Sequence, residues 1–486
     1  MNQEIIKVNP QSLWTNFEKL NEIPRASKKE ERVVEFVKNF GESLGLDTYV
    51  DKVGNIVIRK PATPGMEDRQ AVVLQAHVDM VHQKNADTDF DFDTEGIRSY
   101  IDGDWLKAEG TTLGSDNGIG VAAAMSVLEA TDIEHGPLEA LFTIDEETGM
   151  TGAFALEAGV LQADILLNMD TEEEGELTIG CAGGIDTNLT GTYQTEATPA
   201  GAVAYKIVVN GLKGGHSGGE IHLGRGNANK IMNRLLYGAS SFGLRVAEVD
   251  GGGLRNAIPR ESFAVVTVEA DKADAFEAYI KEMAETVAEE LKARETSLNI
   301  EAVKTNVLAE VMATTDQKAL LNAVYACPNG VLRMSDEIEG LVETSTNLAR
   351  VLVRGGKIES QSLTRSSVES GKADAANAVR AAFETAGYDV EQTGDYPGWK
   401  PKPEAAIVGV LTERFKANFP GQEPVVNAVH AGLECGIIGR NYPEMDMISF
   451  GPTIHNPHSP DEMVEIPTVE RFWNYLIDIL KNIPKK

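Results

Sequence analysis

The sequence contains little cysteine, and none of it is arranged as a thiolate metal site. The three cysteines, Cys181, Cys327 and Cys435, are far apart, and no C-x-x-C pair occurs. An odd number of isolated cysteines gives no support for a disulfide framework or for a zinc site built from thiolates. Reduced, unpaired thiols are typical of cytoplasmic proteins, so we expect a cytoplasmic location.

Long apolar runs and an excess of basic residues are also missing. No apolar stretch reaches the roughly 20 residues that a membrane span requires, and no basic segment followed by an apolar one opens the chain. We therefore expect no membrane helix and no signal peptide. Asp and Glu total 75 against 44 Lys and Arg, a formal net charge of −31. Such a surface repels nucleic acid and anionic lipid, so we predict neither as a partner.

A glycine-rich turn is present, but it lacks the features of a nucleotide-binding loop. The stretch "LGSDNGIG" at 113–120 does not follow the G-x-G-x-x-G order, and no Walker lysine comes after it. Both motifs depend on glycines and a lysine at fixed positions around the phosphates. The sequence therefore does not support a nucleotide-binding function.

The length and the pattern of apolar residues indicate more than one domain. At 486 residues the chain is longer than an ordinary single domain. Short apolar runs bounded by polar residues occur at 71–77, 138–144 and 164–168, with helical patterns between some of them. This alternation predicts an α/β catalytic domain with a mixed, mostly parallel sheet flanked by helices.

The character of the sequence changes near residue 186. Segments 205–209 and 263–268 alternate in polarity as half-exposed strands do, and 272–291 has the pattern of a long surface helix. The Pro- and Gly-containing stretch 395–404 is typical of a hinge. We predict a split catalytic domain with an α+β domain inserted into it, with the boundaries 1–185, 186–399 and 400–486.

Near the N-terminus, Ser27 and Glu30 have the spacing of a capping box. Apolar residues then recur at helical intervals from Val33 to Leu44. We predict a helix there with its first turn capped by these two side chains.

Polar side chains follow the first buried strand at once. In "QAHVDMVHQ", His77 and Asp79 are two residues apart, so on a strand they face the same way. Ligands of open α/β sheets bind at the carboxyl ends of the strands. His77 suits a metal ligand, and Asp79 suits the group that accepts its other imidazole N–H. The alternative is an ordinary polar loop after a strand.

Further carboxylates follow the other segments. Glu146 and Glu147 come after the strand ending at Ile144, and Asp170 comes after "ILLNM". Adjacent acids at a strand end repel each other unless a cation compensates them. Asp116 lies in the glycine-rich turn, where its alternative role is a helix N-cap. Taken together, these positions favour one shared site over several independent solvated loops.

Two candidate histidine ligands lie near the C-terminus. His455 and His458 stand between prolines in "GPTIHNPHSPDE", and prolines stiffen such a loop. Nitrogen and oxygen donors without sulfur suit Zn²⁺, with Mn²⁺ and Co²⁺ as alternatives. Two such ions, about 3.5–4 Å apart, activate water and polarise a carbonyl.

At this point the sequence resembles the co-catalytic metallopeptidases, which include aminoacylases, glutamate carboxypeptidases and carnosine-type dipeptidases. The resemblance extends over essentially the whole chain. It is carried by blocks in the expected order, among them "KPATPGME", "VVLQAHVDMV", "GTTLGSDNGIG", "GCAGGID", "GLKGGHSGGEIH", "RNAIPRE", "HAGLECG", "YPEMDM" and "GPTIHNPHSPDE".

The resemblance implies a role for each metal-site residue. One metal would be held by His77, Asp116 and Asp170. The other would be held by Asp116, Glu147 and His458, because the family pattern keeps the histidine that precedes Ser-Pro. Asp79 would orient His77, and the peptide bond after Asp116 would be cis.

The resemblance also implies the chemistry. Water bridging two divalent ions would attack the peptide carbonyl, with Glu146 as the general base that later protonates the leaving amine. Burial raises the pKa of such a glutamate, and nearby cations lower it. The expected activity is hydrolysis of unblocked dipeptides, including Xaa-His dipeptides such as carnosine.

Three residues of the inserted domain would bind the substrate. His216, between glycines in "GLKGGHSGG", would stabilise the oxyanion, from its own chain or from the partner in a homodimer. Asn256 would contact the peptide backbone, and Arg365 would clamp the C-terminal carboxylate. The inserted domain would serve as a lid and a dimerisation domain, and we expect it to close over the substrate.

Two other functional readings remain open at this stage. An aminoacylase or a tripeptidase would use the same metal site on a different substrate. A metal-binding protein without turnover would keep the ligands, but it would have no use for Glu146. Acetylation of the substrate's amino group separates a dipeptidase from an aminoacylase, because a dipeptidase needs that group free and an aminoacylase needs it acylated.

Overall fold

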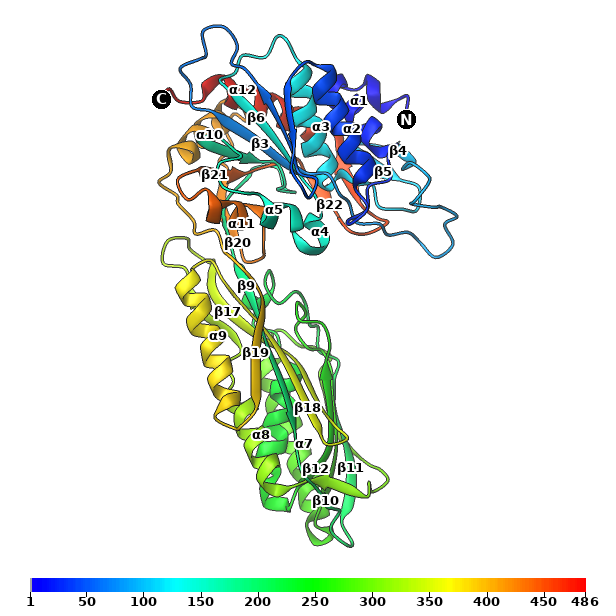
Figure 1. Ribbon diagram of the computed structural model, residues 1–486. Coiled ribbons are helices and arrows are strands. Elements are labelled where there is room, and N and C mark those ends of the chain that lie inside the picture. The colour runs from blue at the N-terminus through cyan, green and yellow to red at the C-terminus, as the bar shows by residue number, and fades with distance from the viewer. Residues whose placement is uncertain (1) are drawn as a thin grey trace. The chain divides into compact units, whose positions relative to one another are not determined.

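The computed structural model describes residues 2–486, and the chain forms two compact units. Unit 1 contains the residues up to Gly180 together with Trp399–Ala428 and Leu433–Lys486, and unit 2 contains Cys181–Gly398 and Val429–Gly432. Each unit is built on its own large β-sheet (Figure 1). Within the described residues, no helix combines the length and the apolar character needed to cross a membrane.

Unit 1 is an α/β layer. Its helices are η1 (Ile5–Lys7), α1 (Gln11–Asn21), α2 (Glu31–Ser43), α3 (Ser115–Glu129), α4 (Glu146–Gly149), α5 (Thr151–Ala155), α10 (Ala406–Asn418), α11 (Glu434–Asn441) and α12 (Ile466–Asn482). Its strands are β1 (Asp47–Val50), β2 (Ile56–Lys60), β3 (Val72–His77), β4 (Ser99–Asp102), β5 (Trp105–Ala108), β6 (Leu138–Thr143), β7 (Ile165–Asn168), β8 (Glu176–Cys181), β20 (Val425–Val429), β21 (Asp446–Ser449), β22 (Ile454–His455) and β23 (Met463–Glu465).

The large sheet of unit 1 is mixed, with parallel strands at its centre. Its order is β1-β2-β6-β3-β7-β21-β8-β20. β6, β3, β7 and β21 run parallel, whereas β2 joins β6 antiparallel and β8 joins β21 antiparallel. A second, four-stranded sheet has the order β22-β23-β5-β4. The predicted α/β class, with a mixed sheet flanked by helices, is confirmed.

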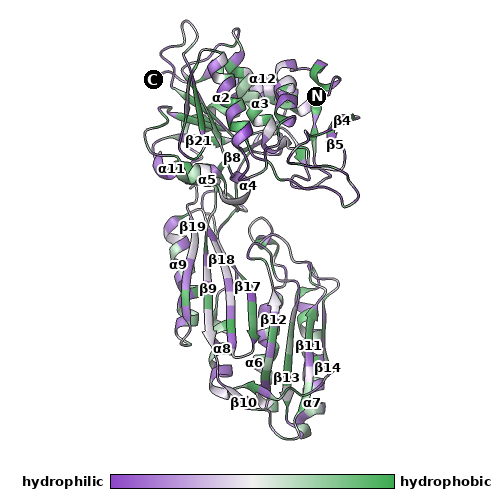
Figure 2. Cartoon of the chain, turned by 45° about the vertical axis from the view of Figure 1, so that its right-hand side comes forward, coloured by the Kyte–Doolittle hydropathy of each residue, from purple (hydrophilic) through white to green (hydrophobic). Residues whose placement is uncertain are grey.

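The central strands of unit 1 are buried on both faces, which explains their apolar sequences. Every residue of β3, β6 and β7 is buried. Helices cover the faces: α3 packs against β3 and α1 packs against α3, while α10 contacts both β21 and α12 (Figure 1). A parallel strand covered on both faces reads as a continuous apolar run rather than an alternating one. Figure 2 shows these strands as a hydrophobic centre.

Unit 2 is an α+β unit. Its helices are η2 (Ile221–Leu223), α6 (Ala228–Gly238), η3 (Ala239–Phe242), η4 (Ala270–Lys272), α7 (Ala273–Leu291), α8 (Thr314–Ala326) and α9 (Glu369–Glu384). Its strands are β9 (Gly183–Thr192), β10 (Thr195–Ala197), β11 (Val203–Asn210), β12 (Arg245–Gly252), β13 (Ser262–Val268), β14 (Asn299–Lys304), β15 (Glu310–Met312), β16 (Gly330–Met334), β17 (Val342–Arg354), β18 (Lys357–Ser366) and β19 (Asp389–Tyr396).

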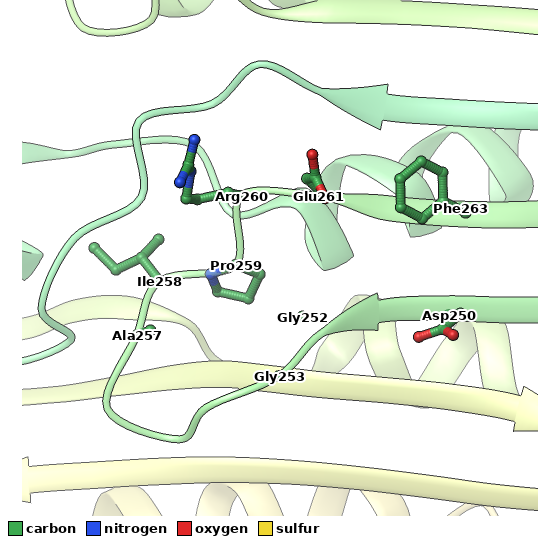
Figure 3. Close-up of a pocket in the computed structure, with 9 residues that line it drawn as sticks. All are labelled: Asp250, Gly252, Gly253, Ala257, Ile258, Pro259, Arg260, Glu261 and Phe263. Atoms are coloured by element: carbon green, nitrogen blue, oxygen red, sulfur yellow. The ribbon is translucent and has the colours of Figure 1, made fainter. Parts of the chain in front are cut away.

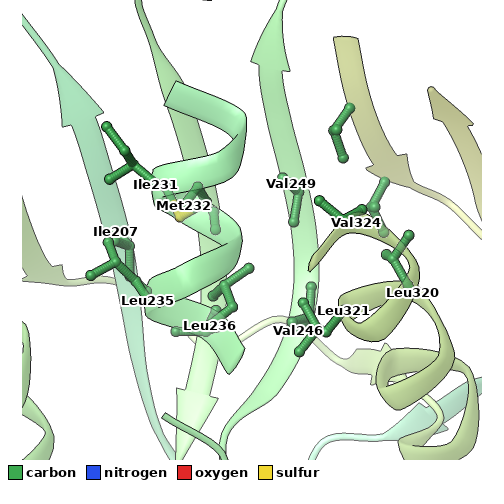
Figure 4. Close-up of a cluster of buried hydrophobic side chains, with 14 of the residues drawn as sticks. Ile207, Ile231, Met232, Leu235, Leu236, Val246, Val249, Leu320, Leu321 and Val324 are labelled. Carbon is green, nitrogen blue, oxygen red and sulfur yellow. The ribbon is translucent and has the colours of Figure 1, made fainter. Parts of the chain in front are cut away.

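The large sheet of unit 2 is antiparallel, and helices cover one of its faces. Its order is β14-β11-β13-β12-β17-β18-β9-β19, with β16 paired to β17. Figure 4 shows α6 and α8 with their apolar side chains directed at the strands, including Leu235, Leu236 and Leu321. Strands of such a sheet alternate between core and solvent, and Figure 2 shows this banding along them.

The structure corrects two details of the sequence prediction. The predicted hinge at 395–404 begins as strand, because β19 runs to Tyr396. The capping box is wrong: α2 begins after Glu30 with no side-chain cap.

Candidate metal centre

The predicted ligands of unit 1 come from the carboxyl ends of neighbouring parallel strands. His77 is the last residue of β3, Glu146 and Glu147 follow β6, and Asp170 follows β7. Parallel strands end at the same edge of a sheet, so side chains that follow them gather at that edge. The fold thus brings together residues that are up to 93 positions apart along the chain.

The first group of converging side chains consists of His77, Asp116 and Asp170. Their nitrogen and oxygen donor atoms lie within 4.8 Å of one another. His77 Nε2 is 3.2 Å from Asp116 Oδ1 and 3.4 Å from Asp170 Oδ1. A histidine with two carboxylates at this spacing is a set of donors suited to a divalent ion such as Zn²⁺.

The second group consists of Asp116, Glu147 and His458, and it shares one residue with the first. His458 Nε2 lies 3.1 Å from Asp116 Oδ2 and 2.9 Å from Glu147 Oε2. Asp116 therefore directs Oδ1 at one imidazole and Oδ2 at the other. This is the arrangement expected of a carboxylate that bridges two ions.

Asp116 does not cap α3, although it lies in its first turn. The residue at the N-cap position of α3 is Gly114, in a left-handed conformation, and Asp116 itself departs from helical geometry with ψ of 110°. The Asp116–Asn117 peptide bond is cis, as the resemblance implies. The N-cap reading of Asp116 is wrong, because both of its carboxylate oxygens face imidazoles.

A buried glutamate that the sequence did not reveal supports this turn. Glu462 accepts hydrogen bonds from the backbone N–H groups of residues 113–116, at 2.8–3.3 Å, and one from the Ser115 hydroxyl at 2.6 Å. Its carboxylate is fully buried. Glu462, from near the C-terminus, therefore binds four consecutive N–H groups of the turn that presents Asp116.

Asp79 lies beside Nδ1, the second ring nitrogen of His77. His77 Nδ1 is 3.3 Å from Asp79 Oδ1 and 3.1 Å from the Asp79 carbonyl oxygen. Both residues are buried. A histidine whose Nδ1–H is held in this way presents Nε2 as a lone-pair donor, which is the form a metal ligand needs.

The electrostatics of the cluster fit a divalent cation. Burial by itself would raise the pKa of Asp116, but hydrogen bonds from His458 and His77 hold it below its usual value. The hydrogen bonds that His458 makes with Asp116 and Glu147 raise the pKa of His458 to about 11. Among the described residues, Glu147 Oε1 is buried without a hydrogen-bond partner. Carboxylates that raise the pKa of a neighbouring imidazole favour positive charge beside them, and Glu147 Oε1 is buried with no hydrogen-bond partner in the described part of the chain. Both features suit bound cations.

Glu146 is placed to act on a group bound beside these ligands. One of its carboxylate oxygens lies within 4.8 Å of a ring nitrogen of His77 and of a carboxylate oxygen of Glu147. Burial raises the pKa of Glu146 well above its usual value, against the opposing effect of His77. Geometry alone allows Glu146 to serve as a ligand or as a base, and retention of metal after its removal distinguishes the two.

Two further acids near the ligands were missed by the sequence reasoning. Burial, followed by the charges of Asp116 and Asp170, raises the pKa of Glu172 to about 8. Burial raises the pKa of Glu434 to about 7, and its Oε2 accepts hydrogen bonds from Gln75 (2.6 Å) and Thr143 (2.7 Å). Glu172, two residues after Asp170, carried a local signal, whereas Glu434 belongs to the cluster only through tertiary contacts.

His455 is not part of either ligand group. Its ring lies 4.9 Å from that of Trp105, and its side chain is exposed. His458 stands three residues later with a positive φ of 61°, and it reaches both Asp116 and Glu147. The geometry thus favours His458 over His455.

His216 lies in unit 2 in a conformation that fixes its tautomer. The backbone N–H of Gly219 donates to His216 Nδ1 at 2.9 Å. Nδ1 is then the acceptor nitrogen, so the ring proton is on Nε2, which becomes a hydrogen-bond donor. Burial, followed by Arg365, lowers the pKa of His216 and so favours this neutral form.

The glycines around His216 serve the packing of unit 2 itself. A Cβ at Gly218 would clash with the carbonyl oxygen of His430. At Gly218 the close neighbour is the protein backbone.

The loop that carries Asn256 pairs with the loop that carries His216. The Ser217 N–H donates to the Asn256 carbonyl at 2.8 Å, and the Ile258 N–H donates to the Gly215 carbonyl at 2.8 Å. Asn256 is exposed. A pocket of about 380 Å³ lies beside this loop, lined in part by Ala257 and Ile258 (Figure 3).

Arg365 is buried in unit 2 and has unused donor capacity. Its Nη1 donates to the Tyr396 hydroxyl at 2.8 Å. Its Nε has no hydrogen-bond partner within residues 2–486. A buried guanidinium with a free N–H is suited to a carboxylate ligand.

The comparisons with known proteins agree with this geometry. The chain is 46% identical over 486 residues to the cytosol non-specific dipeptidase of Escherichia coli, a match that covers 99% of this chain and 100% of that protein. The structure of an aminoacylhistidine dipeptidase from Vibrio alginolyticus is 47% identical, with a TM-score of 0.95, and the match covers 100% of this chain and 99% of that one.

A more distant likeness shows the fold alone. The aminopeptidase PepT of Bacillus cereus is 16% identical with a TM-score of 0.62, over 98% of this chain and 99% of that one. Residues 73–482, most of the chain, match the family described as "Peptidase family M20/M25/M40". The predicted membership of the co-catalytic metallopeptidases is confirmed. This chain belongs to peptidase family M20/M25/M40.

Proposed function

We propose that this chain is a metal-dependent dipeptidase that hydrolyses unblocked dipeptides, including Xaa-His dipeptides such as carnosine. The observation that carries the proposal is the pair of ligand groups that share Asp116, with Glu146 beside them. The names of the Escherichia coli and Vibrio alginolyticus relatives, both dipeptidases matched over their whole length, support the same activity.

The residues present fit two divalent ions. His77, Asp116 and Asp170 would hold one, and Asp116, Glu147 and His458 would hold the other. When bound, such a pair polarises the substrate carbonyl and lowers the pKa of water. Nitrogen and oxygen donors without sulfur are compatible with Zn²⁺, which we propose as the resident ion, and also with Mn²⁺ or Co²⁺.

Glu146 moves the proton in the proposed reaction. As the oxygen of water forms its bond to the peptide carbonyl carbon, the Glu146 carboxylate accepts the proton that water loses. As the C–N bond breaks, the same group gives that proton to the leaving amine. Asp79 holds the ring of His77 in one orientation throughout. The two products are free amino acids.

Three residues of unit 2 are proposed to bind the substrate. His216 would donate its Nε2–H to the carbonyl oxyanion, which the acceptor role of Nδ1 supports. Asn256 would contact the peptide backbone. Arg365 would bind the C-terminal carboxylate, which its buried position and free Nε–H support.

We further propose that the enzyme is a cytoplasmic homodimer. The Escherichia coli relative is named a cytosol dipeptidase, which supports the location. Residues 186–399 would form the lid and the dimerisation domain. His216 would then act within its own chain or across the dimer.

Blocking the substrate's amino group tests the proposed specificity. We expect β-Ala-His and Ala-Ala to be hydrolysed, and their N-acetyl forms to show kcat/KM at least about 100-fold lower. Acetylation turns the charged amine into a larger, neutral amide, and a site that binds a polar group rejects an analogue that lacks it. The measurement is release of free amino acids by the metal-loaded enzyme. Faster cleavage of the acetylated forms would contradict the dipeptidase function and would indicate an aminoacylase.

A further inference from the structure

A short segment between α1 and α2 contacts three stretches of chain that carry metal-site residues. They are the loop after β3, the turn at the start of α3 and the turn after β6. The segment is Arg25–Glu30, with the sequence "RASKKE". It precedes residues 73–482, which match the family description. Both of its end residues are buried although both are charged. Charged side chains are rarely buried unless they are paired or bonded, so their partners are informative.

Arg25 joins the loop after His77 to the turn before Asp116. Its Nη1 donates to the carbonyl oxygens of Val78 (3.0 Å) and Asp79 (3.2 Å). Its Nη2 donates to the carbonyl oxygen of Gly114 at 2.7 Å. The guanidinium is a rigid, planar fork, so bonds from its two ends fix the separation of the loops that it joins.

The backbone of the same segment reinforces this link. The Met80 N–H donates to the Arg25 carbonyl at 3.1 Å, and Ala26 pairs with Met80 in a parallel bridge. The Ser27 hydroxyl then donates to Asp79 Oδ2 at 2.8 Å. Asp79 is thus held from its carbonyl side by Arg25 and from its carboxylate side by Ser27.

Asp79 and Glu30 together bind three consecutive backbone N–H groups. Glu30 Oε1 accepts from the Asp145 N–H at 3.0 Å. Asp79 Oδ1 accepts from the Glu146 N–H at 3.1 Å, and Oδ2 accepts from the Glu147 N–H at 3.3 Å. Asp145 has a positive φ of 53°, so this turn departs from the commonest backbone conformations. The carboxylates therefore determine where the Glu146 and Glu147 side chains point.

We propose that Arg25–Glu30 is a positioning segment for the metal centre, which sets the relative placement of His77, Asp116 and the Glu146–Glu147 turn. The proposal rests on the metal-dependent function proposed above. It accounts for why Ser27 and Glu30 do not cap α2: their side chains are engaged with Asp79 and with the Asp145 N–H. None of the six residues contacts the substrate in this proposal.

The first test replaces the guanidinium fork. Arg25→Lys keeps the positive charge, but a single ammonium group cannot reproduce bonds from two ends of a planar fork. We expect Zn²⁺ affinity, measured by competition with a chromophoric chelator, to fall about 10- to 100-fold, as for other groups that orient metal ligands. Arg234→Lys is the matched control, because Arg234 pairs with Glu290 on the surface of unit 2. Its Zn²⁺ affinity should equal that of the unchanged protein.

The second test uses two substitutions at one position. Glu30→Ala removes the acceptor of the Asp145 N–H, whereas Glu30→Gln keeps an oxygen that can accept it. We expect Glu30→Ala to lower Zn²⁺ affinity and kcat roughly tenfold with KM within about twofold, and Glu30→Gln to recover most of both. These milder variants also serve if Arg25→Lys does not fold.

Thermal unfolding separates positioning from general stabilisation. A ligand that binds only the folded protein raises its Tm by an amount that depends on affinity. We expect the rise in Tm on adding Zn²⁺ to shrink in Arg25→Lys and in Glu30→Ala. Equal losses of Tm with and without Zn²⁺, together with unchanged Zn²⁺ affinity, would overturn the positioning role. Zn²⁺ affinity is measured without substrate, so failure to cleave dipeptides would contradict the proposed function and leave this result interpretable.

Discussion

Glu146→Ala should lower kcat for β-Ala-His roughly 10³- to 10⁴-fold, the upper part of the range for removal of a general base. The substitution removes the carboxylate that takes the proton from the attacking water and returns it to the amine. Both ligand groups that share Asp116 remain complete without Glu146. We therefore expect two Zn²⁺ ions per chain to remain bound, as measured by elemental analysis after gel filtration.

Glu173→Ala is the matched control for this prediction. Glu173 is an exposed glutamate that follows Asp170 by three residues, and it belongs to neither ligand group. Its kcat should stay within about twofold of the unchanged enzyme, as for most surface positions. Loss of a metal ion from Glu146→Ala would instead make Glu146 a ligand, and kcat within tenfold of normal would exclude it as the base.

Asp116→Asn should remove activity and also metal. The two carboxylate oxygens of Asp116 face His77 and His458, so one residue belongs to both groups. An asparagine has one carbonyl oxygen and no negative charge, so it cannot bridge two cations. Because metal ions contribute several kcal/mol to such transition states, we expect kcat to fall at least about 10³-fold. Metal content should fall below two ions per chain.

The control for Asp116→Asn is Asp87→Asn, a charge-matched change at an exposed position. It should leave both kcat and metal content unchanged. The bridging role would be contradicted if Asp116→Asn retained two ions and normal activity. Loss of one ion only, with the other bound normally, would assign Asp116 to a single site.

The site in unit 1 could be located from the sequence because its residues follow recognisable strands. The apolar runs at 71–77, 138–144 and 164–168 correspond to β3, β6 and β7. Polar residues directly after buried strands fall at one edge of a parallel sheet, so strand order need not be known to predict that they meet. The family and the α/β class also followed from sequence blocks and alternation.

The supporting contacts could not be predicted, because they depend on tertiary packing. Ser27 and Glu30 have the spacing of a capping box, yet the Glu30 carboxylate bonds a backbone N–H 115 residues away. A local pattern cannot show that a distant loop competes for the same oxygen. Glu462 likewise binds a turn about 346 residues earlier in the chain. Such long-range hydrogen bonds leave no periodic signal.

The sequence did not predict the pairing of loops in unit 2 either. The tautomer of His216 depends on the backbone N–H of Gly219, which only the folded loop reveals. The short segment Val429–Gly432 groups with unit 2 although the chain around it belongs to unit 1. Its composition does not distinguish it from its neighbours. The proposed roles of His216, Asn256 and Arg365 stay predictions.

The most direct test of the account is a metal titration of stripped enzyme with a dipeptide as substrate. The protein is treated with EDTA, and β-Ala-His and a panel of free dipeptides are then assayed while Zn²⁺, Mn²⁺ or Co²⁺ is added stepwise. The account predicts no hydrolysis by the stripped protein and activity that saturates at about two ions per chain, since the site has two ligand groups. Full activity after metal removal, or no cleavage of any dipeptide with any of the three metals, would contradict it.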